Sequence, residues 1–192
     1  MKIHQPAELI QDANVALQML KEGNERFLKG QLCDKGTYAT DREVLNGGQK
    51  PFAVVLTCAD SRVAPEIFFD QKLGDIFIIR NAGNVADNTA LGSLEYAVEH
   101  LHSPLVVVCG HSKCGAVNAA CANGGEGLPP NIKSITDRIQ PAVAKGGDVD
   151  TVIRNNVGIM VEQVKADDIV KHKGAKVVGA YYDIHTGVVS WL

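Results

Sequence analysis

The stretch FAVVLT at residues 52–57 decides the fold, because it is a short, unbroken apolar run rich in β-forming residues. Such a run is typical of a strand buried on both faces, as in a parallel sheet that helices cover on each side. Three further runs have the same character, namely IFII at 76–79, LVVV at 105–108 and VVGAYY at 177–182. The sequence therefore predicts a mostly parallel central β-sheet.

Helical patterns lie between these runs. They cover residues 65–70, 87–102, 116–122, 132–143 and 150–171. Apolar residues also recur at helical spacing from Pro6 to Lys29, where Gly23 predicts one interrupted helix or two short helices. The polar, glycine-rich segment 31–50 predicts a loop. The alternation of strands and helices indicates an α/β fold in which helices flank the sheet.

The chain has 192 residues, which suits a single domain better than two. We expect residues 1–50 to form an N-terminal helical arm and loop, and residues 51–192 to form the α/β core. The formal net charge is -3 and no run of five or six like charges occurs, which argues against nucleic acid or a membrane as partner. Glu8 and Asp12 lie where a signal peptide would be uncharged, so we expect a cytoplasmic protein.

The five cysteines are too few and odd in number for a disulfide framework, so each thiol needs its own explanation. Cys58 directly follows the first buried run, and His111 and Cys114 follow the run at 105–108. Because ligands bind beyond the carboxyl ends of parallel strands, these three residues should face one crevice if their strands are neighbours. Two thiolates and an imidazole form a standard zinc set, whose fourth position is left to water or to Asp60.

Taken singly, each of these residues is more typical of a structural role, since free cysteines are often buried. Taken together, their placement after two strands beside Asp60 and Arg62 favours a metal site. Two other sites are excluded. The sequence contains no C-x-x-C pair for disulfide exchange, and GHSKCG at residues 110–115 lacks the Gly-Lys-Ser/Thr ending of a phosphate-binding loop. The remaining cysteines, Cys33, Cys109 and Cys121, are expected to be structural thiols.

Three segments resemble the β-class carbonic anhydrases, the bacterial members in particular. They are CADSRVAPEIFFDQKLGDIFIIRNAGN at 58–84, GSLEYAVEHL at 92–101 and CGHSKCGAV at 109–117. The resemblance implies one Zn²⁺ per chain, held by Cys58, His111 and Cys114. It also implies carbonate dehydratase activity (EC 4.2.1.1), the reversible hydration of CO₂ to bicarbonate and a proton by zinc-bound hydroxide.

The resemblance further implies that Asp60 and Arg62 form a catalytic dyad, with Asp60 as the fourth zinc ligand in a closed state. An ionised carboxylate can orient the hydroxide, and a planar guanidinium can hold that carboxylate bidentately. Without the neighbouring Cys58, the same pair would be typical of a surface ion pair. Two thiolates neutralise the charge of the zinc ion, so we expect activity to favour alkaline pH.

By position, five residues resemble the lining of the family's substrate pocket: Gln49, Phe77, Ala82, Tyr96 and Gly115. The resemblance implies that Gln49, Phe77 and Tyr96 come from a partner subunit, so we expect a homodimer or a dimer of dimers. Phe77 and Tyr96 are equally typical of packing residues. His100, four residues after Tyr96 on the same helix face, resembles a proposed proton-shuttle position.

Some bacterial members hold inhibitory bicarbonate in a pocket of Trp, Arg and Tyr. Arg80 and Tyr182 match two of these residues, but Val55 stands at the tryptophan position. We therefore expect no allosteric inhibition by bicarbonate. Two other functions fit the same zinc set: hydrolysis of carbonyl sulfide or carbon disulfide, and a catalytically inactive zinc-binding protein. The intact Asp60–Arg62 pair disfavours the inactive alternative.

Overall fold

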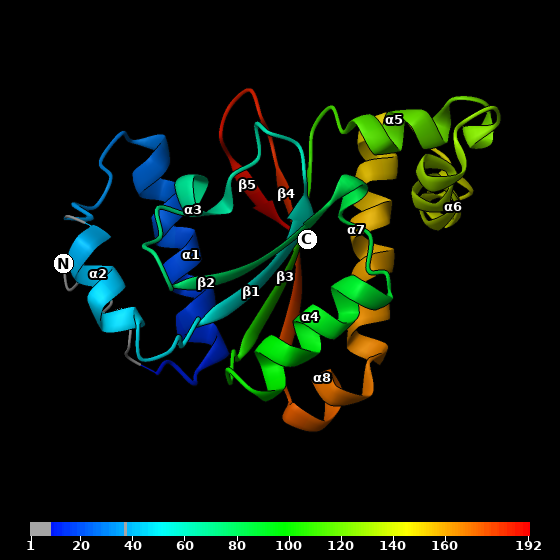
Figure 1. Cartoon of the computed structure of the whole chain (residues 1–192). Helices are drawn as coiled ribbons and strands as arrows, with labels where there is room; N and C mark the ends of the chain where they lie inside the picture. Colours follow the sequence, from blue (N-terminus) through cyan, green and yellow to red (C-terminus); the bar gives the residue numbers. More distant parts are fainter. Residues whose placement is uncertain (1–8, 37) are drawn as a thin grey trace.

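The computed structural model describes residues 9–36 and 38–192, and it has the predicted α/β architecture with a mostly parallel central sheet (Figure 1). The strands are β1 (Ala53–Cys58), β2 (Ile76–Asn81), β3 (Leu105–His111), β4 (Lys176–Tyr182) and β5 (Val189–Trp191). Their order across the sheet is β2-β1-β3-β4-β5, and the first four are parallel. β5 pairs antiparallel with β4 and was not predicted.

The helices form two layers around the sheet. They are α1 (Ala13–Leu28), α2 (Tyr38–Leu45), α3 (Pro65–Phe68), α4 (Asn88–Glu99), α5 (Gly115–Cys121), α6 (Pro130–Val143), α7 (Val149–Ala166) and α8 (Asp168–Lys173), with 3₁₀ turns η1 (Ala82–Asn84) and η2 (Asn123–Gly125). α1 and α3 pack on one face of the sheet, and α4 and α7 pack on the other. Within the described residues, no helix is both long and apolar enough to cross a bilayer.

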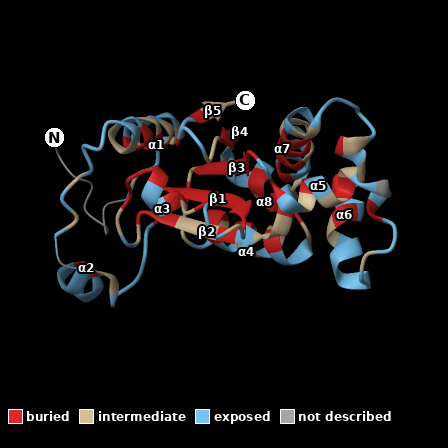
Figure 2. Ribbon diagram, turned by 90° about the horizontal axis from the view of Figure 1, so that it is seen from above, coloured by how far each residue is buried: buried red, intermediate tan, exposed pale blue. Residues whose placement is uncertain are grey.

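The central strands are buried on both faces, which explains why their sequences are apolar without alternation (Figure 2). Val54 and Leu56 of β1 pack in the cluster that contains α4 and α7. Val55, between them in sequence, packs in the opposite cluster with Leu20 of α1. The two apolar layers therefore close over β1 and β3 and leave the carboxyl ends of these strands at one edge of the core.

Two helix predictions need correction. The segment 31–50 is not all loop, because it contains α2. The buried side chain of α2 is Asp41, while Tyr38 and Val44 are exposed, so this helix carries no apolar stripe that could signal it.

The single helical pattern at 150–171 is two helices. Asp167 ends α7, and its carboxylate accepts hydrogen bonds from the N–H groups of Ile169 and Val170 at the start of α8.

Gly23 does not interrupt α1, which runs continuously from Ala13 to Leu28; residues 6–8 of the predicted helix lie outside the described part of the chain. Gly23 is a contact point, because a Cβ atom there would lie 1.7 Å from the carbonyl oxygen of Phe69. The glycine thus allows α1 to approach the end of α3 closely.

We expect Gly23→Ala to lower the free energy of unfolding by about 2 kcal/mol or more, because the backbone at Phe69 must move to admit the methyl group. Gly158→Ala is the matched control. Gly158 lies exposed within α7, and no described atom lies within 4 Å of its added Cβ, so alanine should stabilise the helix by about 0.5–1 kcal/mol. Urea denaturation of both variants tests this, and a native midpoint for Gly23→Ala would contradict it.

Candidate metal centre

Cys58, His111 and Cys114 meet at the carboxyl edge of the sheet. Cys58 ends β1 and His111 ends β3, and these neighbouring strands are parallel, so both side chains emerge at the same edge. Cys114 lies one turn further on, directly before α5. One ligand atom from each residue lies within 4.8 Å of the others, and all three residues are buried. The sequence predicted this common crevice.

The imidazole of His111 is arranged as a metal ligand. Its Nδ1 lies 2.9 Å from the carbonyl oxygen of Ser112, and because a carbonyl only accepts, Nδ1 carries the proton. Nε2 therefore presents a lone pair, and it has no hydrogen-bond partner among the described residues although the ring is fully buried. An unpaired buried acceptor is costly in a protein, and a cation satisfies it.

The two sulfurs of the cluster shift each other's pKa in opposite directions. The Cys114 thiol, the neighbouring His111 ring and the Gly83 N–H, which lies 3.3 Å from the Cys58 sulfur, together lower the pKa of Cys58 to about 4. The same contact with Cys58, together with burial, raises the pKa of Cys114. Two neighbouring sulfurs and the buried imidazole nitrogen of His111 form a donor set that fits a divalent, thiophilic cation such as Zn²⁺.

The turn from His111 to Cys114 is fixed by the neighbouring strand. The Ser112 N–H donates to the carbonyl oxygen of Tyr182, and the Ser112 hydroxyl accepts from the N–H of Ile184. Lys113 then adopts φ of 57°, the left-handed conformation that side chains other than glycine seldom take. These constraints bring Cys114 back beside His111.

Asp60 and Arg62 form the bidentate pair that the sequence predicted. Arg62 donates from Nε to Asp60 Oδ1 at 2.9 Å and from Nη2 to Oδ2 at 2.7 Å, and its backbone N–H also reaches Oδ1. These hydrogen bonds hold the pKa of the Asp60 carboxyl well below its usual range. Both carboxylate oxygens are thus directed at Arg62 in this structure, and Asp60 is ionised at neutral pH.

Arg80 has a role that the sequence did not reveal. It lies on β2 beside the end of β1 and donates to the carbonyl oxygens of Cys58, at 3.1 Å, and Asp60, at 2.7 Å. The guanidinium therefore fixes the main chain that carries both a ligand and the dyad.

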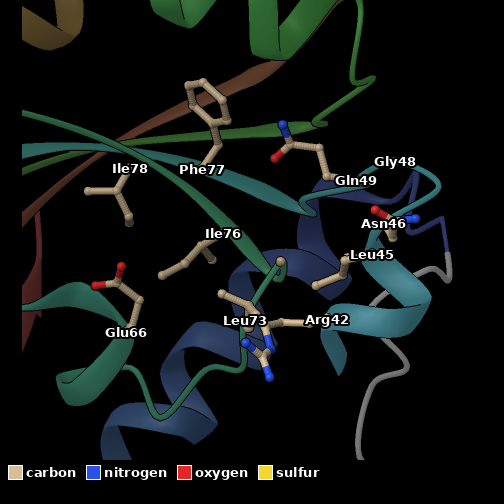
Figure 3. Close-up of a pocket in the computed structure, with 11 residues that line it drawn as sticks. Arg42, Leu45, Asn46, Gly48, Gln49, Glu66, Leu73, Ile76, Phe77 and Ile78 are labelled. Atoms are coloured by element: carbon tan, nitrogen blue, oxygen red, sulfur yellow. The ribbon is translucent and has the colours of Figure 1, made fainter. Parts of the chain in front are cut away.

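The five predicted pocket residues divide into two groups. Ala82 directly precedes Gly83, whose N–H donates to the Cys58 sulfur, and Gly115 directly follows Cys114, so both lie next to a residue that contacts or belongs to the cluster. Gln49 and Phe77 instead line a groove of about 590 Å³ along β2, and none of the three cluster residues lines it (Figure 3). The Tyr96 ring, which is half-exposed, lies 6.3 Å from that of Phe77. A single chain does not bring the two groups together.

His100 lies at the end of α4, and its ring is 5.3 Å from that of Tyr96. The three residues at the positions of the bicarbonate pocket are each engaged in other contacts. Val55 is fully buried inside the sheet, and the Tyr182 ring stacks on Phe68 with centroids 4.2 Å apart. The guanidinium of Arg80 is engaged with the main chain described above.

Known proteins match both the sequence and the structure. Residues 53–189 match the family model described as carbonic anhydrase. Carbonic anhydrase 2 of Mycobacterium tuberculosis is 50% identical over 133 residues, which cover 68% of this chain and 64% of that protein. A carbonic anhydrase of Mycolicibacterium smegmatis is 47% identical over 133 residues, 68% of this chain and 65% of its own length. The chain thus spans somewhat less than two thirds of these relatives.

Among solved structures, the β-carbonic anhydrase of Coccomyxa in complex with acetazolamide superposes with a TM-score of 0.72 at 29% identity. The superposition covers 92% of this chain and 86% of the Coccomyxa chain, so the likeness extends over most of both chains. With a family match over most of the core and a relative that is half identical, the chain belongs to the β-carbonic anhydrase family.

Proposed function

We propose that this protein is a zinc-dependent carbonic anhydrase that reversibly hydrates CO₂ to bicarbonate and a proton, with one Zn²⁺ per chain. The observation that carries the proposal is the buried Cys58, His111 and Cys114 cluster, in which His111 Nε2 lacks a partner among the described residues. A site with three protein ligands keeps a fourth position open, which is typical of catalytic rather than structural zinc.

When bound, zinc supplies the Lewis acidity that makes hydroxide available from water near neutral pH. The chain's own residues orient the reaction. The Asp60 carboxylate accepts the hydrogen bond of the nucleophilic hydroxide and directs its lone pair at the carbon of CO₂. Arg62 keeps this carboxylate ionised and fixed through two parallel hydrogen bonds. Arg80 holds the main chain beneath it.

Stopped-flow CO₂ hydration, measured on protein of known zinc content, tests the proposal. We expect a rate proportional to bound zinc. Two other outcomes would contradict it: turnover of carbonyl sulfide or carbon disulfide without CO₂ hydration would indicate the related hydrolase, and full zinc without turnover of any of these substrates would indicate a binding protein. The Asp60–Arg62 pair favours an active enzyme, because a structural site needs no orienting carboxylate.

We also propose that the active form is at least a dimer, with dimers able to pair again. Gln49 and Phe77 line a groove on β2, the edge strand, rather than the surroundings of the cluster. Apolar side chains are exposed near this edge, including Ile67 at 58%, Tyr96 at 48% and Leu73 at 44%. A second copy seated there would bury them and present Gln49 and Phe77 to its partner's metal centre.

Sedimentation measured at assay concentration is expected to give a dimer or a larger assembly. Leu73→Glu places a charge in the groove and should shift the protein toward monomer with a parallel loss of activity. Val188→Glu is the control, because Val188 is similarly exposed, at 40%, in the turn before β5. A fully active monomer would contradict the assignment of Gln49 and Phe77 to a partner's site.

Bicarbonate is expected to inhibit only as the reaction product and without cooperativity. Val55 supplies no indole N–H, Tyr182 is stacked on Phe68, and Arg80 is bound to carbonyl groups. A ligand shifts a two-state equilibrium only when it binds the two states with different affinity. Without the pocket, bicarbonate does not favour either state of Asp60, on Arg62 or on the metal. Any pH-dependent switch of Asp60 should therefore be independent of bicarbonate. CO₂ hydration measured against pH at several bicarbonate concentrations tests this. Cooperative inhibition that disappears in Tyr182→Phe would contradict it.

A further inference from the structure

A polar stripe on α7 binds the backbone beside the metal centre. Asn156, Met160 and Gln163 lie at helical spacing, so their side chains share one face of α7. Asn156 Nδ2 donates to the carbonyl oxygen of Gly83 at 3.0 Å. Further along the same face, the sulfur of Met160 accepts the Ala86 N–H, and Gln163 Nε2 donates to the carbonyl oxygen of Ala86. One helix face thus holds segment 83–86 by its main chain.

Gly83 connects this stripe to the cluster. Its carbonyl oxygen accepts from Asn156, while its N–H donates to the sulfur of Cys58 at 3.3 Å. Gly83 has φ of 75°, and a Cβ there would lie 2.8 Å from Cδ1 of Ile139, so the position requires glycine. Gly83 has no side chain to pack, so the hydrogen bonds of its two backbone groups contribute to its orientation.

Asn156 is an unexpected residue at its position. It is 1% exposed and lies on a helix whose other buried residues are apolar: Val152, Ile153, Val157, Met160, Val161 and Val164. Its Oδ1 has no hydrogen-bond partner among the described residues. Burial of this oxygen therefore lowers the stability of the fold, because no hydrogen bond replaces those it makes with water. The carbonyl oxygen of Gly83 only accepts, so the donor Nδ2 is the useful half of the amide.

We propose that Asn156 is a positioning residue for the metal centre, which acts through Gly83 by aiming the Gly83 N–H at the Cys58 sulfur. This rests on the proposed metal site and adds a residue that contacts neither metal nor substrate. The N–H···S hydrogen bond withdraws electron density from the thiolate and fixes its lone pairs in direction. Partners of this kind commonly change metal affinity or activity by 10- to 100-fold when they are removed.

The test uses the full chain loaded with cobalt(II), whose near-ultraviolet thiolate-to-metal charge-transfer band reports the electron density on sulfur. Asn156→Leu removes the donor in a side chain of similar size, and Asn156→Ala removes it without any added bulk. We expect the band to move to longer wavelength in both variants, because a thiolate that accepts no hydrogen bond is oxidised more easily. We also expect a chelator to remove zinc about tenfold faster from both.

Gln163→Leu is the matched control. It removes a hydrogen bond from the same face of α7 to segment 83–86, but this hydrogen bond ends at the carbonyl oxygen of Ala86 and not at that of Gly83. It should lower thermal stability as the Asn156 variants do and leave both the band and the rate of zinc loss unchanged. The proposal is overturned if the band keeps its native position in both Asn156 variants, or if Gln163→Leu shifts it equally.

The same spectra separate this inference from the proposed function. A native chain that shows no thiolate-to-cobalt band would disprove the metal centre, and the role of Asn156 with it. A native band and native CO₂ hydration, together with unshifted Asn156 variants, would overturn the role of Asn156 alone.

Discussion

Cys58→Ala is expected to leave a folded chain that retains little zinc and hydrates CO₂ at close to the uncatalysed rate. The variant removes one of three proposed ligands and the sulfur whose pKa is lowered to about 4. The Lewis acidity of zinc contributes several kcal/mol to such reactions, and each 1.4 kcal/mol is tenfold in rate, so the loss should be on the order of a thousandfold or more. Cys114→Ala should behave in the same way.

Cys109→Ala is the control for this prediction. Cys109 lies on β3 two residues before His111, but its side chain packs in the apolar cluster on the α1 side of the sheet. Burial raises the pKa of its thiol to about 12, so it stays protonated and is no metal ligand. Metal analysis and stopped-flow assays of the three variants should show full zinc and near-native turnover only for Cys109→Ala. Full zinc with full rate in Cys58→Ala would disprove the assigned site.

Asp60→Asn is expected to keep its zinc and lose about a hundredfold or more in kcat. The amide is the same size as the carboxylate but carries no charge and directs an N–H₂ group toward Arg62, so it no longer orients the hydroxide. Arg62→Lys should cost less, about tenfold, because an ammonium group pairs with the carboxylate without the fork of two parallel bonds. Measuring zinc content together with kcat distinguishes the effect of these two substitutions from the loss of a zinc ligand.

Asp137→Asn is the matched control, since it breaks an exposed ion pair with Lys133 on α6 and should not change the rate. The pH profile adds a second check. Arg62 depresses the pKa of Asp60, so the carboxylate stays charged through the pH range in which an aspartate usually titrates. It loses its charge only in stronger acid. Any change of rate between neutral and alkaline pH should therefore persist in Asp60→Asn. A native rate in this variant would disprove the dyad.

The sequence predicted the central elements of the fold because their signals are local. β1 and β3 are apolar over their full length since both faces are buried, and the ligand residues directly follow them. β5 could not be predicted in this way, because Val189–Trp191 is three residues long and is stabilised by its pairing with β4. The buried Asp41 of α2 likewise gives no apolar periodicity.

The same distinction holds at the metal centre. Cys58, Asp60 and Arg62 form one short motif, and a second motif supplies His111 and Cys114. Spacing indicates the three ligands, and the resemblance to the family indicates the dyad. Asn156 belongs to no motif, and its partner Gly83 is far away in the chain. Only the packing of α7 against segment 83–86 reveals its hydrogen bond. The groove along β2 is also a property of the folded surface.

The order of the strands has a consequence for how the protein acquires its ion. β1 and β3 are neighbours in the sheet, but β2 and α4 lie between them in the chain. Of the three proposed ligands, only His111 and Cys114 are close in the sequence, and Cys58 joins them when β1 pairs with β3, which is a slow, non-local event. The three donors are thus brought together by the folded sheet and not by the local sequence, so we expect the proposed site to bind zinc tightly only in the folded chain.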